Sequence, residues 1–519
     1  MRTYYTVFIT LIMVLPLKIM MSQKLENKNQ TSSEKWLHAT FPNQVVYQVF
    51  TRSFADGNGD GKGDLNGIRK KLPYLKDLGI GAIWLTPIFE SPTYHKYDIT
   101  NYYAIDPECG TLAELKQLVE EAHKVNIKII LDFVANHTSS EHEWFKESAK
   151  GNAAYKNYYY WSSDRTLWNK EPEHWHWLDD HAKGSEKYYG YFWRGMPDLN
   201  YDNNIVRSQI IESAIYWIKE CNIDGYRLDA ASHIYPYAER NKNYEWWKQF
   251  STTLRKVKPD FYIVGEMWGG DTLIAPYLKA GLNAGFNFDC WFNIKASLKE
   301  EKDLMTTKLL EAYKNYDRHN PMFSDALILS NHDNPRIMDE VEGNIDKAKQ
   351  AAAILFTLPY TPYLYYGDEL GMYGPKPDEH IREPFLWQTN DEANSTWEPN
   401  YHNKTTARLS EQIADTNSIY HVYKNLIHLR NSDEVLANGM LTLSLIHKDG
   451  FLMYGREIGN KKYLIIHNLK NLESGIDLSL LSTKNGIEKI ISLNHISRLQ
   501  AYQLFIPAFG SVMVAYEMP

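Results

Sequence analysis

Four apolar, strand-like runs in this sequence carry polar side chains at or just beyond their ends. The groups that follow or close these runs are Asp132-Phe-Val-Ala-Asn136-His137, Arg227-Leu-Asp229, Glu266 and Asn331-His332-Asp333. In a barrel of parallel strands, the carboxyl ends of all strands meet at one rim, where catalytic residues lie. The sequence therefore predicts that residues far apart along the chain share one site.

This set of side chains suits cleavage of a glycosidic bond, which needs one ionised and one protonated carboxyl group. Arg227 lies two residues before Asp229, so both side chains share one face of the strand. We expect its charge to lower the pKa of Asp229 and keep it ionised as a nucleophile. Glu266 is followed by Met267 and Trp268, an apolar flank that would raise its pKa and keep it protonated. Any one of these acids alone could be a structural ion pair or helix cap, but four strand ends together favour catalysis.

The elements that must position these groups alternate between strand-like and helical patterns. Strands are expected at residues 45–50, 79–87, 127–134, 223–228, 261–265, 284–288, 326–330 and 362–366. Helices are expected at residues 66–78, 111–126, 205–220, 244–256, 294–313, 346–358 and 418–430. Thr111 with Glu114 three residues later predicts a capping box. Eight strands, each followed by a helix or a long loop, predict an α/β fold of the (β/α)8 (TIM) barrel type.

Two stretches break the alternation and define the predicted domains. A region rich in Tyr, Trp and His at residues 138–203 is too long for an ordinary loop, so we read it as a small domain inserted after the third strand. The barrel would comprise residues 37–137 and 204–433. Short strands near residues 450–454, 462–468 and 511–516 predict a C-terminal antiparallel β-sandwich over residues 434–519.

The N-terminus has the features of a secretory signal. Arg2 precedes an apolar run at residues 4–17, and a polar stretch follows. We expect a signal peptide at residues 1–22, cleaved near Ser22, and a linker at residues 23–36. An uncleaved anchor is the alternative, although the run is short for a span of about 20 residues. The protein is thus predicted to be secreted or periplasmic.

Composition restricts the partners. The net charge is −8 and no long basic run is present, which argues against nucleic acid. The three cysteines, Cys109, Cys221 and Cys290, give neither a disulfide framework nor a zinc pattern, so we expect buried thiols. We expect a monomer with no membrane span after signal removal.

A glycine-rich turn places oxygen-bearing side chains at alternate positions. Its residues are Asp56, Asn58, Asp60, Lys62 and Asp64. Donors at positions 1, 3 and 5 with glycine at 6 match the first half of an EF-hand loop, but position 12 is Gly67 rather than Glu. Asp64 would supply the missing carboxylate and Lys62 a backbone carbonyl. We predict a Ca²⁺ site; a loop of Asx turns without metal is the alternative.

Seven segments in order resemble the α-amylase family of retaining glycoside hydrolases. They are Gly79-Ile-Gly-Ala-Ile-Trp-Leu-Thr-Pro87, Asp132-Phe-Val-Ala-Asn-His137, Met196-Pro-Asp-Leu-Asn200, Gly225-Tyr-Arg-Leu-Asp-Ala-Ala231, Val264-Gly-Glu266, Asn331-His-Asp333 and Gly367-Asp-Glu-Leu-Gly371. The resemblance covers nearly the whole mature chain. It implies a barrel, an inserted domain and a C-terminal sandwich, as read above, and a structural role for the metal loop. It leaves open a second Ca²⁺ site at Asn136.

The same resemblance implies roles for site residues. Asp229 would be the nucleophile, Glu266 the acid/base, and Asp333 would hold the sugar hydroxyls and distort the ring. The implied substrate-binding residues are Tyr97, His137, Arg227, His332, His233 and Trp268. Among these, Tyr97 would stack under the sugar at the cleavage site, and the neighbouring Asp98 would brace it.

Three features bear on the activity within the family. Met196-Pro-Asp-Leu-Asn200 resembles an intermediate group between oligo-1,6-glucosidases and neopullulanases. Exo-acting α-glucosidases of the family carry an Asp three residues before the stacking tyrosine, where this chain has Tyr94, which favours an open cleft. Ser232 replaces a Lys often found in α-amylases, which puts product-side contacts in doubt.

The resulting prediction is a secreted, endo-acting α-amylase that hydrolyses α-1,4 bonds of starch-like glucans and maltooligosaccharides. The alternatives are a cyclomaltodextrinase or neopullulanase, an α-glucosidase, an enzyme that mainly transfers glucosyl groups and, from another class, a non-catalytic glucan-binding or scaffold barrel. The last alternative is disfavoured because the three acids are all present.

Overall fold

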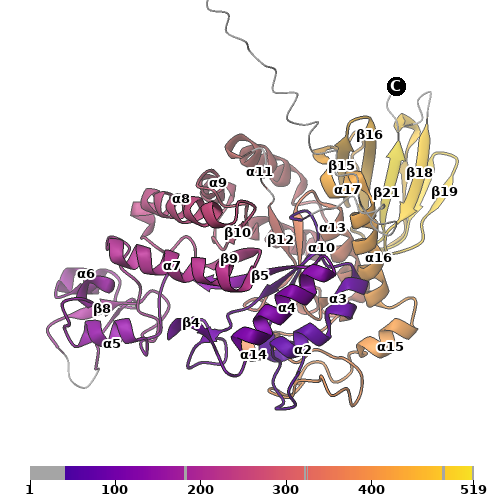
Figure 1. Cartoon of the computed structure of the whole chain (residues 1–519). Coiled ribbons are helices and arrows are strands. Elements are labelled where there is room, and N and C mark those ends of the chain that lie inside the picture. Colours follow the sequence, from indigo (N-terminus) through magenta and orange to yellow (C-terminus); the bar gives the residue numbers. More distant parts are fainter. Residues whose placement is uncertain (1–40, 180–183, 321–322, 324, 482–485, 517–519) are drawn as a thin grey trace, which may run out of the picture. The chain divides into compact units, whose positions relative to one another are not determined.

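A closed sheet of eight parallel strands carries the fold of this computed structural model, which describes residues 41–179, 184–320, 323, 325–481 and 486–516 (Figure 1). The strands are β1 (Val46–Val49), β2 (Ala82–Leu85), β5 (Lys128–Val134), β9 (Gly225–Asp229), β10 (Tyr262–Gly265), β11 (Ala284–Gly285), β12 (Ala326–Ile328) and β13 (Thr361–Tyr365). Their order is β11-β10-β9-β5-β2-β1-β13-β12. A parallel bridge between Phe286 and Ala326 joins the two end strands and closes the barrel. The predicted barrel, with a strand at each expected position, is confirmed.

The barrel strands are buried on both faces, as their unbroken apolar runs predicted. One set of side chains, which includes Val46, Ile130 and Val264, fills the barrel interior together with Trp84 and Phe286. The alternate residues pack outward into a second, larger core beneath the helices.

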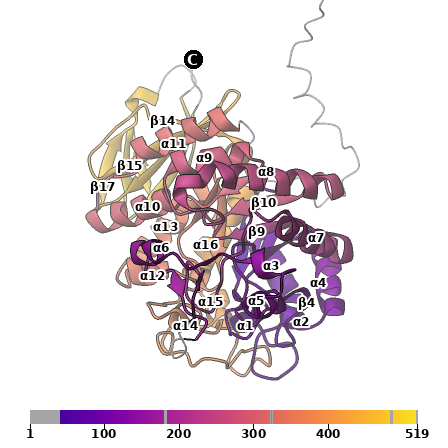
Figure 2. The same cartoon turned by 90° about the vertical axis from the view of Figure 1, so that its left-hand side faces the viewer.

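Helices surround the strands, as α7 and α8 do beside β9 and β10 (Figure 2). The longer helices are α4 (Leu112–Lys124), α7 (Asn204–Cys221), α8 (Arg240–Val257), α9 (Asp271–Lys279), α10 (Phe288–Glu300), α11 (Thr306–His319), α13 (Ile345–Thr357) and α16 (Ile419–Ser432). The short ones are α1 (Thr51–Phe54), α2 (Leu65–Lys70), α3 (Leu72–Leu78), α12 (Ile337–Glu340), α14 (Asp378–Ile381), α15 (Leu409–Ala414) and α17 (Glu434–Asn438). The predicted capping box of Thr111 and Glu114 opens α4.

Two expected helices are wrong in extent. The segment expected as one helix at residues 294–313 forms α10 and α11, because Glu301 adopts a left-handed φ of 53° and the carboxylate of Asp303 accepts from the backbone N–H groups of Met305 and Thr306. The segment at residues 66–78 forms α2 and α3, because Pro73 lies in the first turn of α3 and cannot continue α2.

Short elements follow the third barrel strand, in the region read as an inserted domain. They are α5 (Glu143–Ala149), η3 (Lys156–Tyr158), β6 (Trp161–Ser162), α6 (Arg165–Lys170), β7 (Trp175–His176) and β8 (Lys187–Tyr189). Strands β6, β8 and β7 form a small antiparallel sheet. An antiparallel pair, β3 (Phe89–Glu90) and β4 (Asn101–Ile105), lies within the barrel segment before it. Further single turns are η4 (Tyr237–Glu239) and η5 (Asp368–Leu370).

The C-terminal part contains two antiparallel sheets that share one core (Figure 1). The larger sheet holds β14 (Met440–Leu443), β15 (Phe451–Ile458), β16 (Lys461–Asn468), β18 (Ile487–Ser492) and β21 (Ser511–Tyr516), and the smaller one β17 (Ser474–Asp477), β19 (Arg498–Gln500) and β20 (Gln503–Ile506), with η6 (Ser479–Leu481) between them in sequence. Leu464 and Val514 of the larger sheet and Ile476 and Leu504 of the smaller belong to the same buried cluster. This arrangement confirms the predicted antiparallel C-terminal domain.

The predicted signal peptide and linker lie outside the described residues. Within the described ranges, no helix is both long and apolar enough to cross a membrane. Cys109, Cys221 and Cys290 are buried free thiols, as expected.

Candidate active site

The register of neighbouring strands brings the predicted acids together at one rim. In β5 and β9, Asp132 is paired with Arg227 and Val134 with Asp229. In β9 and β10, Arg227 is paired with Val264, so Glu266 follows β10 beside the last residue of β9. Asp333 follows β12 on the same rim, and Asp229, Glu266 and Asp333 all line one cleft.

The Arg227 guanidinium lies at the centre of this group. Its Nη1 contacts Asp132 Oδ1 at 2.8 Å and Asp229 Oδ1 at 2.7 Å, and its Nη2 contacts Glu266 Oε2 at 2.9 Å. The arginine side chain is only 1% exposed. One guanidinium therefore holds both predicted catalytic carboxylates and a third acid below them. The sequence located Asp132 at this strand end but assigned it no role. The signal that could have indicated its contact with the guanidinium was Arg227 on the neighbouring strand.

Burial shifts the pKa values of these carboxyl groups upward. Burial raises the pKa of Asp229, although Arg227 opposes the shift. The expectation that Arg227 would leave this pKa lowered is therefore wrong, because removal of water outweighs the guanidinium. Burial also raises the pKa of Glu266, against Arg227, as the sequence predicted for an acid. The pKa of Asp132, raised by burial, is about 7.

Asp333 differs from the other acids in electrostatic environment. Burial opposes its ionisation, but His332 and Arg382 together hold its pKa well below the usual range. The Nε2 of His332 lies 3.0 Å from Asp333 Oδ2, and Nη2 of Arg382 lies 2.9 Å from Oδ1. His332 and Arg382 therefore favour the ionised form of Asp333. Arg382 was missed from the sequence because it follows β13 in an irregular stretch without periodicity.

Aromatic rings form the floor beside these acids. The ring of Tyr97 stacks on His332, with centroids 5.3 Å apart and planes 8° apart. The Tyr97 hydroxyl donates to Asp132 Oδ2 at 3.0 Å. The ring of His137 donates from Nε2 to the backbone carbonyl of Tyr97 at 3.2 Å. Tyr97 thus contacts both of the other predicted binding residues, His137 and His332.

The cleft lined by Tyr97 and His137 has a volume of about 790 Å³, within the range of about 300–1,000 Å³ typical of ligand sites. The predicted residues His233 and Trp268 line it. The Trp268 indole N–H donates to Glu266 Oε1 at 3.2 Å. Phe192 and Trp193 from the inserted segment also line the cleft and are 46% and 47% exposed. Sequence reasoning missed both because they lie in a stretch with no period.

The predicted metal loop folds as a series of tight turns. The carboxylate of Asp56 accepts from the N–H groups of Asn58, Gly59 and Gly61, and Asp64 accepts from Gly57 and Gly67. Within the described ranges, no group of three or more acidic, His or Cys side chains is gathered as a metal cage. The Ca²⁺ site therefore stays a prediction. The donor set, in which Asn58 and Asp60 are exposed, has the hard oxygen chemistry that Ca²⁺ prefers.

A model of the alpha-amylase catalytic domain matches residues 48–439 of the chain. The chain belongs to the alpha-amylase family. Alpha-amylase 3 of Dictyoglomus thermophilum is 42% identical over 455 residues, covering 85% of this chain and 87% of the relative. An oligo-1,6-glucosidase of Parageobacillus thermoglucosidasius is 30% identical over 506 residues, covering 82% and 89%. A crystal structure of an alpha-amylase from H. orenii superposes with a TM-score of 0.83 at 36% identity, covering 91% of this chain and 99% of that one.

These matches establish the class of reaction for this alpha-amylase-family chain. It is a glycoside hydrolase, and its relatives include enzymes named for different glucosidic linkages. The linkage and the mode of attack therefore depend on the cleft itself.

Proposed function

We propose that the protein is a secreted, endo-acting alpha-amylase that hydrolyses α-1,4-glucosidic bonds of starch-like glucans and maltooligosaccharides with retention of configuration. The observation that carries this proposal is the single guanidinium of Arg227 bound to both Asp229 and Glu266 at the cleft floor. Retaining enzymes need two carboxyl groups only about 5–5.5 Å apart, and a shared guanidinium keeps a pair at close range.

In the first step, Asp229 attacks the anomeric carbon of the glucosyl unit, and Glu266 gives its proton to the departing glycosidic oxygen. A covalent glucosyl–Asp229 ester results. In the second step, Glu266 removes a proton from water, the water oxygen attacks the same carbon, and the carboxylate of Asp229 leaves. The raised pKa of Glu266 supports its role as the acid.

The remaining residues hold the sugar. The ionised Asp333 accepts hydrogen bonds from sugar hydroxyl groups, and His137 and His332 hydrogen-bond the same unit. Tyr97 packs against its apolar face. His233 and Trp268 contact units on the leaving-group side.

Endo-attack is supported by the lining of the cleft. Tyr94 lines it at the position where exo-acting α-glucosidases of the family carry an acid, and its ring stacks on Trp397 with centroids 5.3 Å apart. Its hydroxyl accepts from Arg382 Nη1 at 2.8 Å, so the guanidinium is directed at protein oxygens. The aromatic lining, which includes Phe192 and Trp193, suits stacking against several sugar units.

The test of catalysis is Glu266→Gln, compared with Glu220→Gln, which alters an exposed ion pair with Lys116. On amylose, we expect Glu266→Gln to lose about 10²–10⁴-fold in kcat, with an unchanged circular dichroism spectrum, and Glu220→Gln to behave as wild type. Wild-type rates in folded Glu266→Gln would overturn the proposal and favour a non-catalytic barrel.

The linkage and mode of attack are tested by product analysis on amylose, pullulan and cyclodextrin. An endo-amylase shortens amylose rapidly and releases a series of maltooligosaccharides. Release of glucose alone from amylose would instead identify an α-glucosidase. Rapid opening of cyclodextrin would favour the cyclomaltodextrinase alternative.

We also propose that the loop at residues 56–64 binds a structural Ca²⁺. Side-chain oxygens of Asp56, Asn58, Asp60 and Asp64, with the carbonyl of Lys62, would hold it. Such an ion would tie the loop to the start of α2, where Asp64 is the N-cap. We expect EDTA to lower the melting temperature and added Ca²⁺ to restore it, and Asp60→Asn to weaken both effects. An unchanged melting temperature after exhaustive chelation, verified by metal analysis, would contradict this site.

A further inference from the structure

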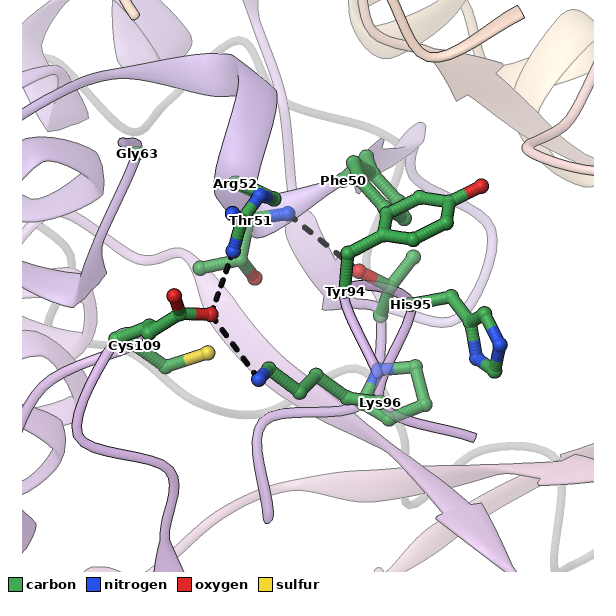
Figure 3. A pocket seen from close by; sticks show the side chains of 11 residues that line it. Phe50, Thr51, Arg52, Gly63, Tyr94, His95, Lys96 and Cys109 are labelled. Carbon is green, nitrogen blue, oxygen red and sulfur yellow. Dashed lines mark hydrogen bonds and ion pairs between the residues drawn. The ribbon is translucent and has the colours of Figure 1, made fainter. Parts of the chain in front are cut away.

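The segment His95-Lys96-Tyr97 presents its side chains to two different environments. His95 and Tyr97 line the cleft. Lys96 does not line the cleft; it lines a small enclosed cavity that His95 also borders (Figure 3). In this view Lys96 and Arg52 point inward, toward an acidic group, while His95 points away.

The backbone of Lys96 is left-handed, with a φ of 65°. A residue with a Cβ adopts this conformation at a cost in free energy, whereas glycine does so freely. Such a conformation persists where neighbouring contacts impose it, and these positions gather at functional sites. The contacts that impose it here must therefore come from the lysine side chain or from the flanking residues.

The side chain of Lys96 is fixed by two carboxylates. Its Nζ lies 2.9 Å from Asp106 Oδ2 and 3.1 Å from Glu108 Oε2, and the side chain is 8% exposed. Asp106 is itself held, because its Oδ2 accepts from the N–H of Ser91 and its Oδ1 from the N–H of Glu108.

Glu108 is anchored equally firmly. Arg52 Nη1 lies 2.5 Å from its Oε2, and Lys62 contacts its Oε1. The lysine thus docks into a socket formed by the side chains of Asp106 and Glu108, each of which is held by further partners.

The next residue, Tyr97, has little freedom if Lys96 is fixed. Its ring is stacked on His332, its hydroxyl bonds Asp132, and its carbonyl accepts from His137. We propose that Lys96 is a positioning residue: docking of its ammonium group between Asp106 and Glu108 holds the left-handed turn that sets Tyr97 on the cleft floor. This inference rests on the proposed function, in which Tyr97 packs under the sugar at the cleavage site.

A glycine at this position separates this role from simple stabilisation. If the ion pairs only stabilise the fold, Lys96→Gly, which removes more atoms, should be at least as harmful as Lys96→Met. If the ion pairs impose the left-handed turn, glycine adopts this turn without them. Methionine still adopts it only at a cost in free energy and lacks the ammonium group that holds it. We therefore expect the order of activity to be wild type, then Lys96→Gly, then Lys96→Met.

The experiment measures kcat and KM on maltoheptaose, with melting temperatures, for wild type, Lys96→Gly, Lys96→Met and the exposed control Lys116→Met. We expect Lys96→Met to lose about 10- to 100-fold in kcat/KM, since small misplacement of a site residue has effects of this size. Lys96→Gly should keep kcat/KM within about threefold of wild type, although its melting temperature should fall as far as that of Lys96→Met. The inference would be overturned if Lys96→Gly lost as much kcat/KM as Lys96→Met. An inactive wild type would instead contradict the proposed function.

A double-mutant cycle covers the case in which Lys96→Met does not fold. Glu108→Gln should lower kcat/KM in the wild-type background because it loosens the socket. In the Lys96→Gly background the same change should leave kcat/KM unaltered, because the turn no longer depends on the socket. Equal losses in both backgrounds would overturn the inference.

Discussion

Two buried arginine sites lie at opposite ends of the barrel and have contrasting partners. At the carboxyl ends of the strands, Arg227 contacts the carboxylates of Asp132, Asp229 and Glu266. Beyond the amino end of β13, Arg456 of β15 contacts only backbone carbonyls among its hydrogen-bond acceptors in the described residues: those of Thr357, Val435, Leu436 and Gly439.

Arg430 follows the pattern of Arg456. It donates to the carbonyls of Phe356, Leu358 and Tyr360 at 2.7–3.0 Å, around the end of α13. Burial lowers the pKa of Arg430 to about 9 and that of Arg456 to about 10. The carboxylates around Arg227 instead raise its pKa against the effect of burial.

The difference separates two uses of the same side chain. Carbonyl oxygens at helix ends carry partial negative charge and do not titrate, so Arg430 and Arg456 satisfy helix termini and join the C-terminal sheets to the barrel. Carboxylates exchange protons near neutral pH in a buried site, so Arg227 controls groups that can react. We therefore expect loss of Arg227 to affect catalysis first and loss of Arg456 to affect stability first.

The largest effect is expected for Arg227→Met. Removing the guanidinium leaves Asp229 and Glu266 without the group that orients them, so kcat/KM on maltoheptaose should fall by about 10³-fold. Arg227→Lys, which keeps the charge but cannot bridge two acids, should recover only a small part of this loss. Wild-type kcat/KM in either variant would show that the bridge has no part in catalysis.

A smaller effect of different kind is expected for Arg456→Met. Several carbonyls lose a charged donor, so the free energy of unfolding in urea should fall by about 3 kcal/mol. The kcat of the folded fraction should remain within about twofold of wild type. Arg498→Met, which alters an exposed pair with Glu473, is the control. If Arg456→Met lost as much kcat as Arg227→Met, the distinction between a catalytic and a structural arginine would be contradicted.

The smallest effect, and the sharpest comparison, is in the pH dependence of the two stability losses. A carboxyl group whose pKa is raised on folding stabilises the protein while protonated and loses that contribution as pH rises through its folded pKa. Burial already raises the pKa values of Asp132, Asp229 and Glu266, to about 7 for Asp132. Without Arg227 these carboxyls must ionise unpaired.

The destabilisation by Arg227→Met should therefore grow from pH 5 to pH 8, whereas that by Arg456→Met should stay level. Urea unfolding of both variants and wild type across this range measures the two slopes. Equal pH dependence of the two destabilisations would contradict the difference that we expect between carboxylate partners at Arg227 and carbonyl partners at Arg456.

The sequence was sufficient for the parts of the site that depend on strand ends. Asp229, Glu266 and Asp333 each follow an apolar run, and the barrel brings such ends together whatever the separation along the chain. Arg382, Phe192 and Trp193 were not predictable in this way, because irregular segments place them and no local period marks a loop residue that faces a cleft. The sign of the Asp229 pKa shift also required the structure, because burial and the guanidinium oppose each other and only packing decides which is larger.

The inserted segment contributes aromatic side chains to the cleft, while the carboxyl groups proposed to react belong to the barrel. This separation has an evolutionary consequence. We expect mutations at Phe192 or Trp193 to alter how the cleft binds its substrate while the carboxyl groups at the strand ends stay unchanged. New specificities within the family can therefore arise in small, individually tolerated steps on one wall of the cleft.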